Sequence, residues 1–130
     1  MYTATTRAIR VTVQPRYLPE QSDPAKSQYV WAYQVRIENT GAVAVQLRSR
    51  HWKITDGLGR LQEVKGRGVV GATPRLEPGE VFEYTSGTPL STPSGIMGGT
   101  YQMVSDTGES FDIEIPTFSL DAPGAARQLN

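Results

Sequence analysis

Apolar and polar residues alternate one by one in the first third of the chain, which is the period of a strand with one buried face. In Arg7–Tyr17 most apolar residues stand at odd positions and most polar ones at even positions. The alternation is strongest in Tyr29–Ile37, where aromatic and β-branched side chains share one face. The first segment predicts a half-buried strand that ends, or lies at an edge, at Pro15. The second predicts a central strand with Trp31 and Tyr33 in the core.

The alternation changes phase once, in the middle of the chain. The turn sequence Asn39-Thr40-Gly41 predicts a hairpin whose second arm begins at Val43. Apolar residues stand at odd positions up to Leu47 and at even positions from Trp52. An extra residue in a strand moves the following side chains to the other face, so the pattern predicts a β-bulge near Ser49–His51.

Glycine and proline divide the rest of the chain into short segments. The polar, proline-containing segment Leu18–Ser27 predicts a loop. Turns are predicted at Asp56-Gly57, Leu76-Glu77-Pro78-Gly79 and Asp106-Thr107-Gly108. Further strands are predicted at Leu61–Val64, Val81–Thr85, Thr100–Val104 and Ser110–Ile115. No segment repeats apolar residues at helical spacing over the length of a helix, so the pattern predicts an all-β protein.

The strand spacing favours an antiparallel two-sheet sandwich of the immunoglobulin or fibronectin type III-like kind, with about seven or eight strands. A small barrel is the alternative. We expect a single domain over residues 1–120. The segment 121–130, DAPGAARQLN, is expected to be a flexible tail because its composition offers little to pack.

Composition excludes several classes of protein. Lys and Arg number 13, Asp and Glu also 13, so net charge gives no attraction to nucleic acid or an anionic membrane, although a local basic patch is compatible with it. The absence of cysteine excludes disulfides and a cysteine nucleophile. No apolar run is long enough for a membrane span, and Met1–Val13 lacks the apolar stretch of a signal peptide. We therefore expect a cytoplasmic protein that binds neither nucleic acid nor membrane.

The glycines of VKGRGVVG, Val64–Gly71, have the G-x-G-x-x-G spacing found in dinucleotide-binding proteins. That motif works only where a strand precedes it and a helix follows, because the pyrophosphate binds the free amides at the start of the helix. Pro74 follows closely, and no βαβ pattern surrounds the motif. The sequence therefore excludes a Rossmann-type cofactor site here.

Two other interpretations of these glycines stay open. In the structural one they supply bulges or turns with positive φ where one strand gives way to the next. In the functional one the exposed amides, with Lys65 and Arg67 beside them, form an anion-binding nest for a phosphate or a carboxylate.

Catalytic and metal-binding candidates are sparse. His51 is the only histidine, so any serine–histidine arrangement would depend on it, and its place beside Trp52 favours an ordinary strand residue. The densest acidic group is typical of a solvated strand face rather than of a metal site; its members are Asp106, Glu109, Asp112 and Glu114. We expect neither an enzyme nor a bound cofactor or metal.

An aromatic residue among cations is the clearest candidate for docking. Trp52 stands near Arg48, Arg50 and Lys53, and if exposed it would be an anchor for a peptide or an anionic ligand. The segment Tyr84-Thr85-Ser86 adds hydroxyl groups close to a turn. It is included as a neighbour of the glycine stretch.

Several segments in fixed order resemble the ApaG family over nearly the whole chain. They are HWKITD at His51–Asp56, GRLQEVKGRGVVGATPRLEPGE at Gly59–Glu80 and YTSGTPLSTPSGIMGGTYQM at Tyr84–Met103, together with the strand Tyr29–Asn39. Departures are confined to the loop after Tyr17 and the C-terminal tail. The combination is specific, although no segment alone would be.

This resemblance implies a fibronectin type III-like sandwich and a binding role. Similar bacterial proteins are small, cytosolic and without established enzymatic activity, and are associated with a diadenosine tetraphosphate hydrolase operon and with cobalt and magnesium tolerance. Related eukaryotic domains, attached to F-box and DNA-polymerase-associated proteins, look like recognition modules for protein partners.

The leading hypothesis is therefore a non-enzymatic module that binds an unknown protein partner through strand edges or through a surface near the glycine stretch. The alternative is a phosphate or nucleotide ligand held by Gly66–Gly71. The candidate binding residues for both are Arg50, Trp52, Lys65, Gly66, Arg67, Gly68, Gly71, Tyr84, Thr85 and Ser86.

Overall fold

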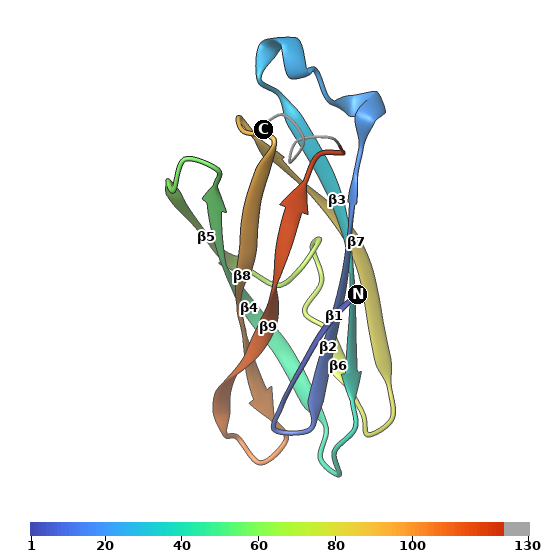
Figure 1. The fold of residues 1–130 in the computed structure, drawn as a ribbon. Coiled ribbons are helices and arrows are strands. Elements are labelled where there is room, and N and C mark those ends of the chain that lie inside the picture. Colours follow the sequence, from blue (N-terminus) through green and yellow to red (C-terminus); the bar gives the residue numbers. More distant parts are fainter. Residues whose placement is uncertain (124–130) are drawn as a thin grey trace.

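Two antiparallel sheets lie face to face in the computed structural model, which describes residues 1–123 (Figure 1). The first sheet has the order β1-β2-β3-β7, with bounds Tyr2–Thr6, Ile9–Tyr17, Tyr29–Asn39 and Val81–Leu90. The second has the order β5-β4-β8-β9, with bounds Leu61–Arg67, Val45–Asp56, Ser94–Ser105 and Ser110–Asp121, and β6 (Arg75–Leu76) also pairs with β4. The predicted two-sheet sandwich is confirmed, and the barrel alternative is not formed.

The described chain has more strands than the pattern predicted, because β1 and β6 carry little apolar signal. β1 pairs with β2 through the two-residue turn Arg7-Ala8, in which both residues have positive φ, 50° and 65°. This is the geometry of a type I′ hairpin turn, normally marked by Asn-Gly. The sequence lacks that mark. Strands β8 and β9 also extend beyond the segments predicted for them.

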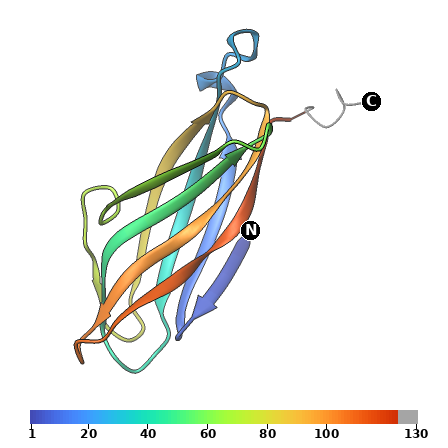
Figure 2. The ribbon, with the colours of Figure 1, turned by 90° about the vertical axis from the view of Figure 1, so that its left-hand side faces the viewer.

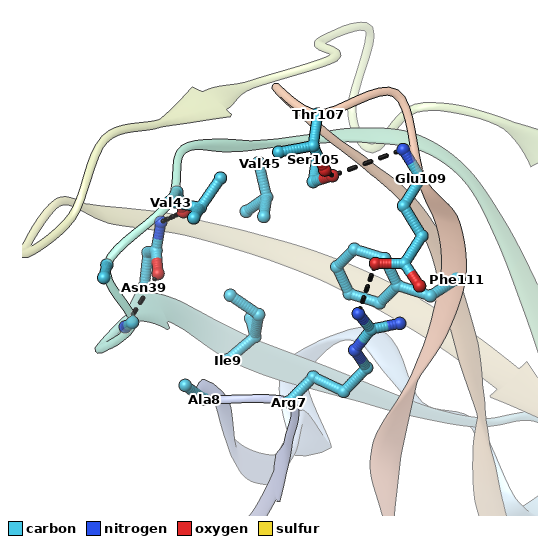
Figure 3. A pocket seen from close by; sticks show the side chains of 12 residues that line it. Arg7, Ala8, Ile9, Asn39, Val43, Val45, Ser105, Thr107, Glu109 and Phe111 are labelled. Carbon is cyan, nitrogen blue, oxygen red and sulfur yellow. Dashed lines mark hydrogen bonds and ion pairs between the residues drawn. The ribbon is translucent and has the colours of Figure 1, made fainter.

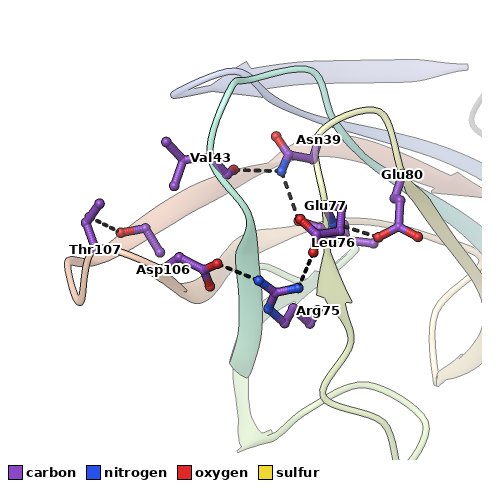
Figure 4. Close-up of polar contacts among 9 residues, drawn as sticks. Asn39, Val43, Arg75, Leu76, Glu77, Glu80, Asp106 and Thr107 are labelled. Atoms are coloured by element: carbon purple, nitrogen blue, oxygen red, sulfur yellow. Dashed lines mark hydrogen bonds and ion pairs between the residues drawn. The ribbon is translucent and has the colours of Figure 1, made fainter.

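The predicted hairpin between β3 and β4 is wrong, because the two strands belong to different sheets. Asn39, fully buried, holds the crossover together: its Nδ2 donates to Val43 O at 2.9 Å and to Leu76 O at 3.0 Å, and its Oδ1 accepts from Gly41 N at 2.9 Å (Figure 4). Arg75 links Glu77 to Asp106 beside it. The Asn-Thr-Gly sequence therefore marks a change of sheet. Local turn chemistry does not distinguish that from a hairpin.

The predicted bulge in β4 is present and lies at Arg48, just before the predicted position. The pairing of β4 with β8 skips Arg48, passing from Leu47 to Ser49. After the bulge the even-numbered residues face the other sheet, so Trp52 and Ile54 are buried. Arg50 lies on the same inward face.

Aromatic side chains fill the middle of the core. Trp31 and Tyr33 are buried as predicted, with 1% and 5% of their surface exposed. The ring of Trp52 lies 5.2 Å from that of Tyr33, 6.2 Å from Tyr101 and 6.1 Å from Phe118, centroid to centroid. Edge-on aromatic packing of this kind stabilises a core beyond the area it buries.

The sandwich is closed along one side and open along the other. On the closed side β1 and β2 lie against β9. On the open side the edge strands are β5 and β7, which diverge in Figure 1 and leave β5 at the outside of the molecule, as Figure 2 also shows. The terms closed side and open side are used below in this sense.

The end of β9 is packed up to Ala122, whose amide donates to Pro93 O at 2.8 Å. The rest of the expected tail, residues 124–130, lies outside the described residues. Residues 1–123 contain no helix long and apolar enough to cross a membrane.

Candidate functional site

A cavity of about 280 Å³ lies between the sheets on the open side. Its walls combine aromatic, aliphatic and hydroxyl side chains with one cation, Arg50. β4 contributes Arg50 and Trp52, β5 contributes Val64, and β7 contributes Ser86 and Thr88. Both sheets therefore build the site, at the place where neither has a further strand to cover it.

Arg50 reaches across the β5 backbone because its partner there has no side chain. Arg50 pairs with Gly66 in the sheet, and a Cβ on Gly66 would lie 2.8 Å from the guanidinium. From this position Nη1 donates to Arg67 O at 3.0 Å and to Gly68 O at 2.8 Å. Gly66 thus gives the guanidinium its path to the edge of β5.

No carboxylate neutralises Arg50: the ion pairs found within residues 1–123 do not include it. Its two acceptors are neutral carbonyl oxygens. A partly buried cation without a counter-ion favours an anionic ligand, because the two charges interact more strongly where water is partly excluded. The cavity can therefore accept an acidic group next to an apolar one.

Tyrosine hydroxyls stand behind Arg50. Tyr84 and Tyr101 share a buried hydrogen bond between their hydroxyls. Burial raises the pKa of both phenols well above the ordinary value, and burial also raises the pKa of Tyr33, with Ser86 and Arg50 opposing that shift. These phenols stay protonated at neutral pH, so they offer hydrogen bonds rather than a general base.

The glycine stretch continues from β5 into a tight turn, and no helix follows it. Gly68, with φ 64°, donates its amide to Arg48 O, while Val69 and Ala72 exchange both backbone hydrogen bonds. Val70 and Gly71, between them, have φ of 42° and 81°, as in a type I′ turn. The strand-turn-helix context of a Rossmann-type site is absent from the described residues, and the positive φ of Gly68 and Gly71 is what the structural interpretation of the glycines predicted.

The anion nest predicted for Gly66–Gly71 loses part of its donors to the fold. The amides of Gly68 and Val69 already bond to carbonyls. The groups of this turn that point toward Arg50 are the carbonyl oxygens of Arg67 and Gly68, which accept from its guanidinium. An anion at this place would meet the guanidinium of Arg50 first.

Most of the predicted binding residues gather at the cavity, and the others do not. Those that line it or lie next to it are Arg50, Trp52, Gly66, Gly68, Tyr84 and Ser86. Lys65 and Arg67 are exposed on the outer face of β5, and Gly71 lies at the tip of the turn. Thr85 lines a separate pocket with Gln34, away from the others.

Trp52 was predicted to be an anchor only if its side chain were exposed. The structure buries it, with only 3% of its surface exposed, so it is not a surface anchor. It forms a wall of the cavity and part of the core. The inward direction of Arg50 could have been predicted from the same change of phase. If even-numbered residues point inward from Trp52 onward, then Arg50, two positions earlier, does so as well.

The remaining chemical candidates lie apart from the cavity. His51 faces outward and its Nε2 lies 2.7 Å from Glu63 Oε1, a contact that lowers the pKa of the Glu63 carboxyl. Asp106 binds Arg75 and Glu109 binds Arg7, so the acidic group is divided. Among the described residues no group of three or more His, Cys, Asp or Glu side chains is placed to hold a metal ion.

A second cavity, of about 230 Å³, lies at the end of the sandwich where the β1–β2 turn meets β9 (Figure 3). Arg7 crosses its rim, binds Glu109 and lies 4.4 Å from the centre of the Phe111 ring. The sequence analysis did not find this cavity, because Arg7 and Glu109 are far apart in sequence. Its charges are already paired, so the open side remains the better candidate site.

Comparisons with known proteins identify the family of the chain. The ApaG domain model matches residues 19–105. The protein ApaG of Rhodospirillum centenum is 63% identical over the whole of both chains, and that of Bradyrhizobium diazoefficiens is 61% identical, also over the whole of both. A crystal structure of a protein assigned as ApaA from Bordetella pertussis has a TM-score of 0.86 and 58% identity, covering 88% of this chain and 94% of that one. The chain belongs to the ApaG family.

Proposed function

We propose that this chain is a non-enzymatic binding module whose site for a protein partner is the cavity on the open side. The observation that supports the proposal is Arg50, which has no counter-ion among the described residues and lies in an aromatic and aliphatic pocket between the edge strands β5 and β7. Arginine and large aromatic side chains are the residue types that contribute most to protein recognition.

The arrangement of the titratable groups favours binding over catalysis. The imidazole of His51 is engaged by Glu63 on the outer face, whereas the hydroxyls of the cavity lie on the inner face. A hydroxyl nucleophile needs a base within hydrogen-bonding reach. In this proposal the partner protein, and not this chain, accounts for the association of similar proteins with cobalt and magnesium tolerance and with dinucleoside polyphosphates.

A phosphate or nucleotide ligand is the second candidate, and the uncompensated Arg50 favours it as well. Arg50 is a natural partner for phosphate oxygens because its guanidinium presents paired donors. In this version the anion contacts Arg50 beside the Gly66–Gly71 turn rather than a nest of amides.

Capture from a native lysate tests the leading proposal. Arg50→Gln removes the charge, and Arg16→Gln is the matched control, since Arg16 is exposed on the first sheet. We expect at least one protein that the original chain and the control recover, and that Arg50→Gln recovers about tenfold less. Thermal unfolding of the variants checks the fold. Equal recovery by the folded variants would overturn the proposal.

An amide NMR titration with pyrophosphate, ATP, diadenosine tetraphosphate and Mg²⁺ tests the second candidate. Saturable shifts confined to Gly66–Gly71 and the Arg50 side chain would support it. A spectrum unchanged at millimolar ligand would remove it and leave the protein partner.

A further inference from the structure

We propose, on the basis of the proposed function, that the partner binds as an additional strand along the free edge of β5, and that its side chains alternate between acidic and apolar. Strand addition is a common mode of peptide recognition: backbone hydrogen bonds supply affinity and alternate side chains supply specificity. The inference depends on which β5 backbone groups are free, which charges flank them and what lies beneath the edge.

The free backbone groups of β5 belong to its odd-numbered residues. Within the part of the chain that the structure describes, β5 pairs with β4 alone, in a register that sets Arg50 opposite Gly66. Just outside the strand, Asp56 N donates to Arg60 O and Gly68 N donates to Arg48 O, so the even-numbered pairs are the hydrogen-bonded ones. The amides and carbonyls of Leu61, Glu63 and Lys65 therefore point away from β4.

The edge of β9, in contrast, is covered by side chains of β1. There Thr6 Oγ1 accepts from Glu114 N at 3.1 Å, and Tyr2 OH accepts from Ser119 N at 3.4 Å. Among the described residues β5 has one such contact, the one from Arg50 to Arg67 O at the C-terminal end. The stretch from Leu61 to Lys65 is left for another chain.

The outer face next to this edge is basic. Lys65 and Arg67 of β5 and Arg48 and Lys53 of β4 are exposed there, and none of them takes part in the ion pairs found within residues 1–123. The carboxylate of β5 itself, Glu63, is bound to His51. Asp112 and Glu114 lie further from the edge, on β9, in pockets that Arg48 and Lys53 also line. An added strand with acidic side chains on this face would meet complementary charge.

The inner face beneath the edge is the cavity described above. Alternate side chains of an added strand would point toward it, because successive side chains of a strand face opposite ways. Val64 and Gln62 form its β5 wall, Pro89 belongs to the β7 wall opposite, and the buried Met97 of β8 also lines it. Small apolar side chains suit this space.

The same charges disfavour a second copy of this chain as the occupant. Two β5 edges paired antiparallel about Lys65 would place this lysine of one copy against the same lysine of the other. Lysine at an edge is one of the means by which proteins prevent such self-pairing. Charge therefore selects an acidic segment of another protein.

The test uses a seven-residue peptide that alternates Glu with Val, acetylated and amidated, added to the full chain and followed by amide hydrogen exchange and NMR. We expect slowed exchange at the amides of Glu63 and Lys65, and a response about tenfold weaker to the same peptide with Lys in place of Glu. No change in β5 at millimolar acidic peptide, or an equal response to both peptides, would overturn the inference.

Variants at Lys65 separate backbone pairing from charge. Lys65→Pro removes one outward amide without touching a β4 hydrogen bond, so it should abolish the response to the acidic peptide. Lys65→Gln removes the charge alone and should weaken binding about twofold to fivefold. If Lys65→Pro, folded by its melting curve, binds as well as Lys65→Gln, the peptide does not bind as a strand.

Two further results distinguish this inference from the proposed function. A partner lost with Arg50→Gln in the lysate experiment, combined with an unchanged β5, would leave the binding module intact and remove the added strand. Light scattering that shows the chain pairing with itself through β5 would overturn the assignment of an acidic partner.

Discussion

The closed and open sides of this sandwich differ in how their edge strands are finished. On the closed side, side chains from β1 bind two amides of β9, and Arg7 joins the turn of β1 to Glu109. On the open side the edges of β5 and β7 border a cavity, and the ion pairs found within residues 1–123 do not include its Arg50. The described strands therefore cover the sandwich along one side and leave the edges of β5 and β7 uncovered along the other.

Truncating one isoleucine on each side should show the largest difference. Ile113 is fully buried in β9, whereas Ile54 lines the open cavity. We expect Ile113→Ala to lower the free energy of unfolding by about 4 kcal/mol and Ile54→Ala by about 2 kcal/mol, because solvent can occupy the space left by Ile54. Denaturant unfolding measures both. Equal losses would mean that the open side is packed as tightly as the closed side.

The turn on the open side tolerates alanine at one glycine and not at another. A Cβ on Gly68 would lie 2.3 Å from Ala72 O, whereas a Cβ on Gly71 meets nothing within 4 Å, although both have positive φ. Gly68→Ala should cost about 3 kcal/mol and Gly71→Ala about 1 kcal/mol. Thermal unfolding of the pair gives the comparison, and similar melting temperatures would show that the turn rearranges freely.

The paired phenols behind Arg50 should make stability depend on alkaline pH. Because burial raises the pKa of Tyr84 and Tyr101, the unfolded chain loses these protons first, from about pH 10 upward. Their contribution is complete below that pH, and stability then falls by about 1.4 kcal/mol per pH unit for each phenol.

Phenylalanine variants isolate this effect. Tyr84→Phe leaves the Tyr101 hydroxyl without its partner and should cost about 1–2 kcal/mol at neutral pH. The double variant with Tyr101→Phe should cost less than the sum of the two single ones. It should also lose most of the alkaline slope in denaturant unfolding, and the part that comes from Tyr33 should remain. A slope unchanged in the double variant would contradict this assignment.

The smallest effect is expected at the covered edge. Thr6→Val keeps the shape of the side chain and removes the oxygen that accepts from Glu114 N. Exchange of that amide should become about fivefold faster, while the Ser119 amide, bound by Tyr2, stays unchanged. If neither amide responds, the β1 side chains do not protect the edge and the contrast with β5 weakens.

Periodicity predicted most of the fold. The strands around Ile9, Trp31 and Val81, the turn at Asp56-Gly57 and the bulge in β4 follow from alternation and turn residues, which act locally. The sheet to which each strand belongs did not follow. The chain passes from one sheet to the other after Asn39, whose side chain donates to Leu76 O. Leu76 is distant in sequence, so local residues do not reveal this contact.

The candidate site was predicted in its residues and not in its geometry. Arg50, Gly66 and Ser86 were candidates from the sequence. The structure pairs Arg50 with Gly66 and sets Ser86 in the wall of the same cavity as Arg50. The inward direction of Arg50 and the burial of Trp52 depend on the bulge, since a shift of one residue exchanges the two faces of a strand. Lys65 and Arg67, expected to assist the glycines, instead flank the edge of β5.

The contact between the first and last strands also constrains the order in which the parts of the molecule fold. Arg7 and Glu109 are separated by 102 positions. The contacts between β1 side chains and β9 can form only after β9 has joined the second sheet. Folds dominated by such distant contacts form slowly, on the scale of milliseconds to seconds. Until β9 is in place the edge that β1 and β2 cover is exposed as well, and the exposed lysine and arginine side chains beside β5 disfavour edge-to-edge pairing of two copies during that interval.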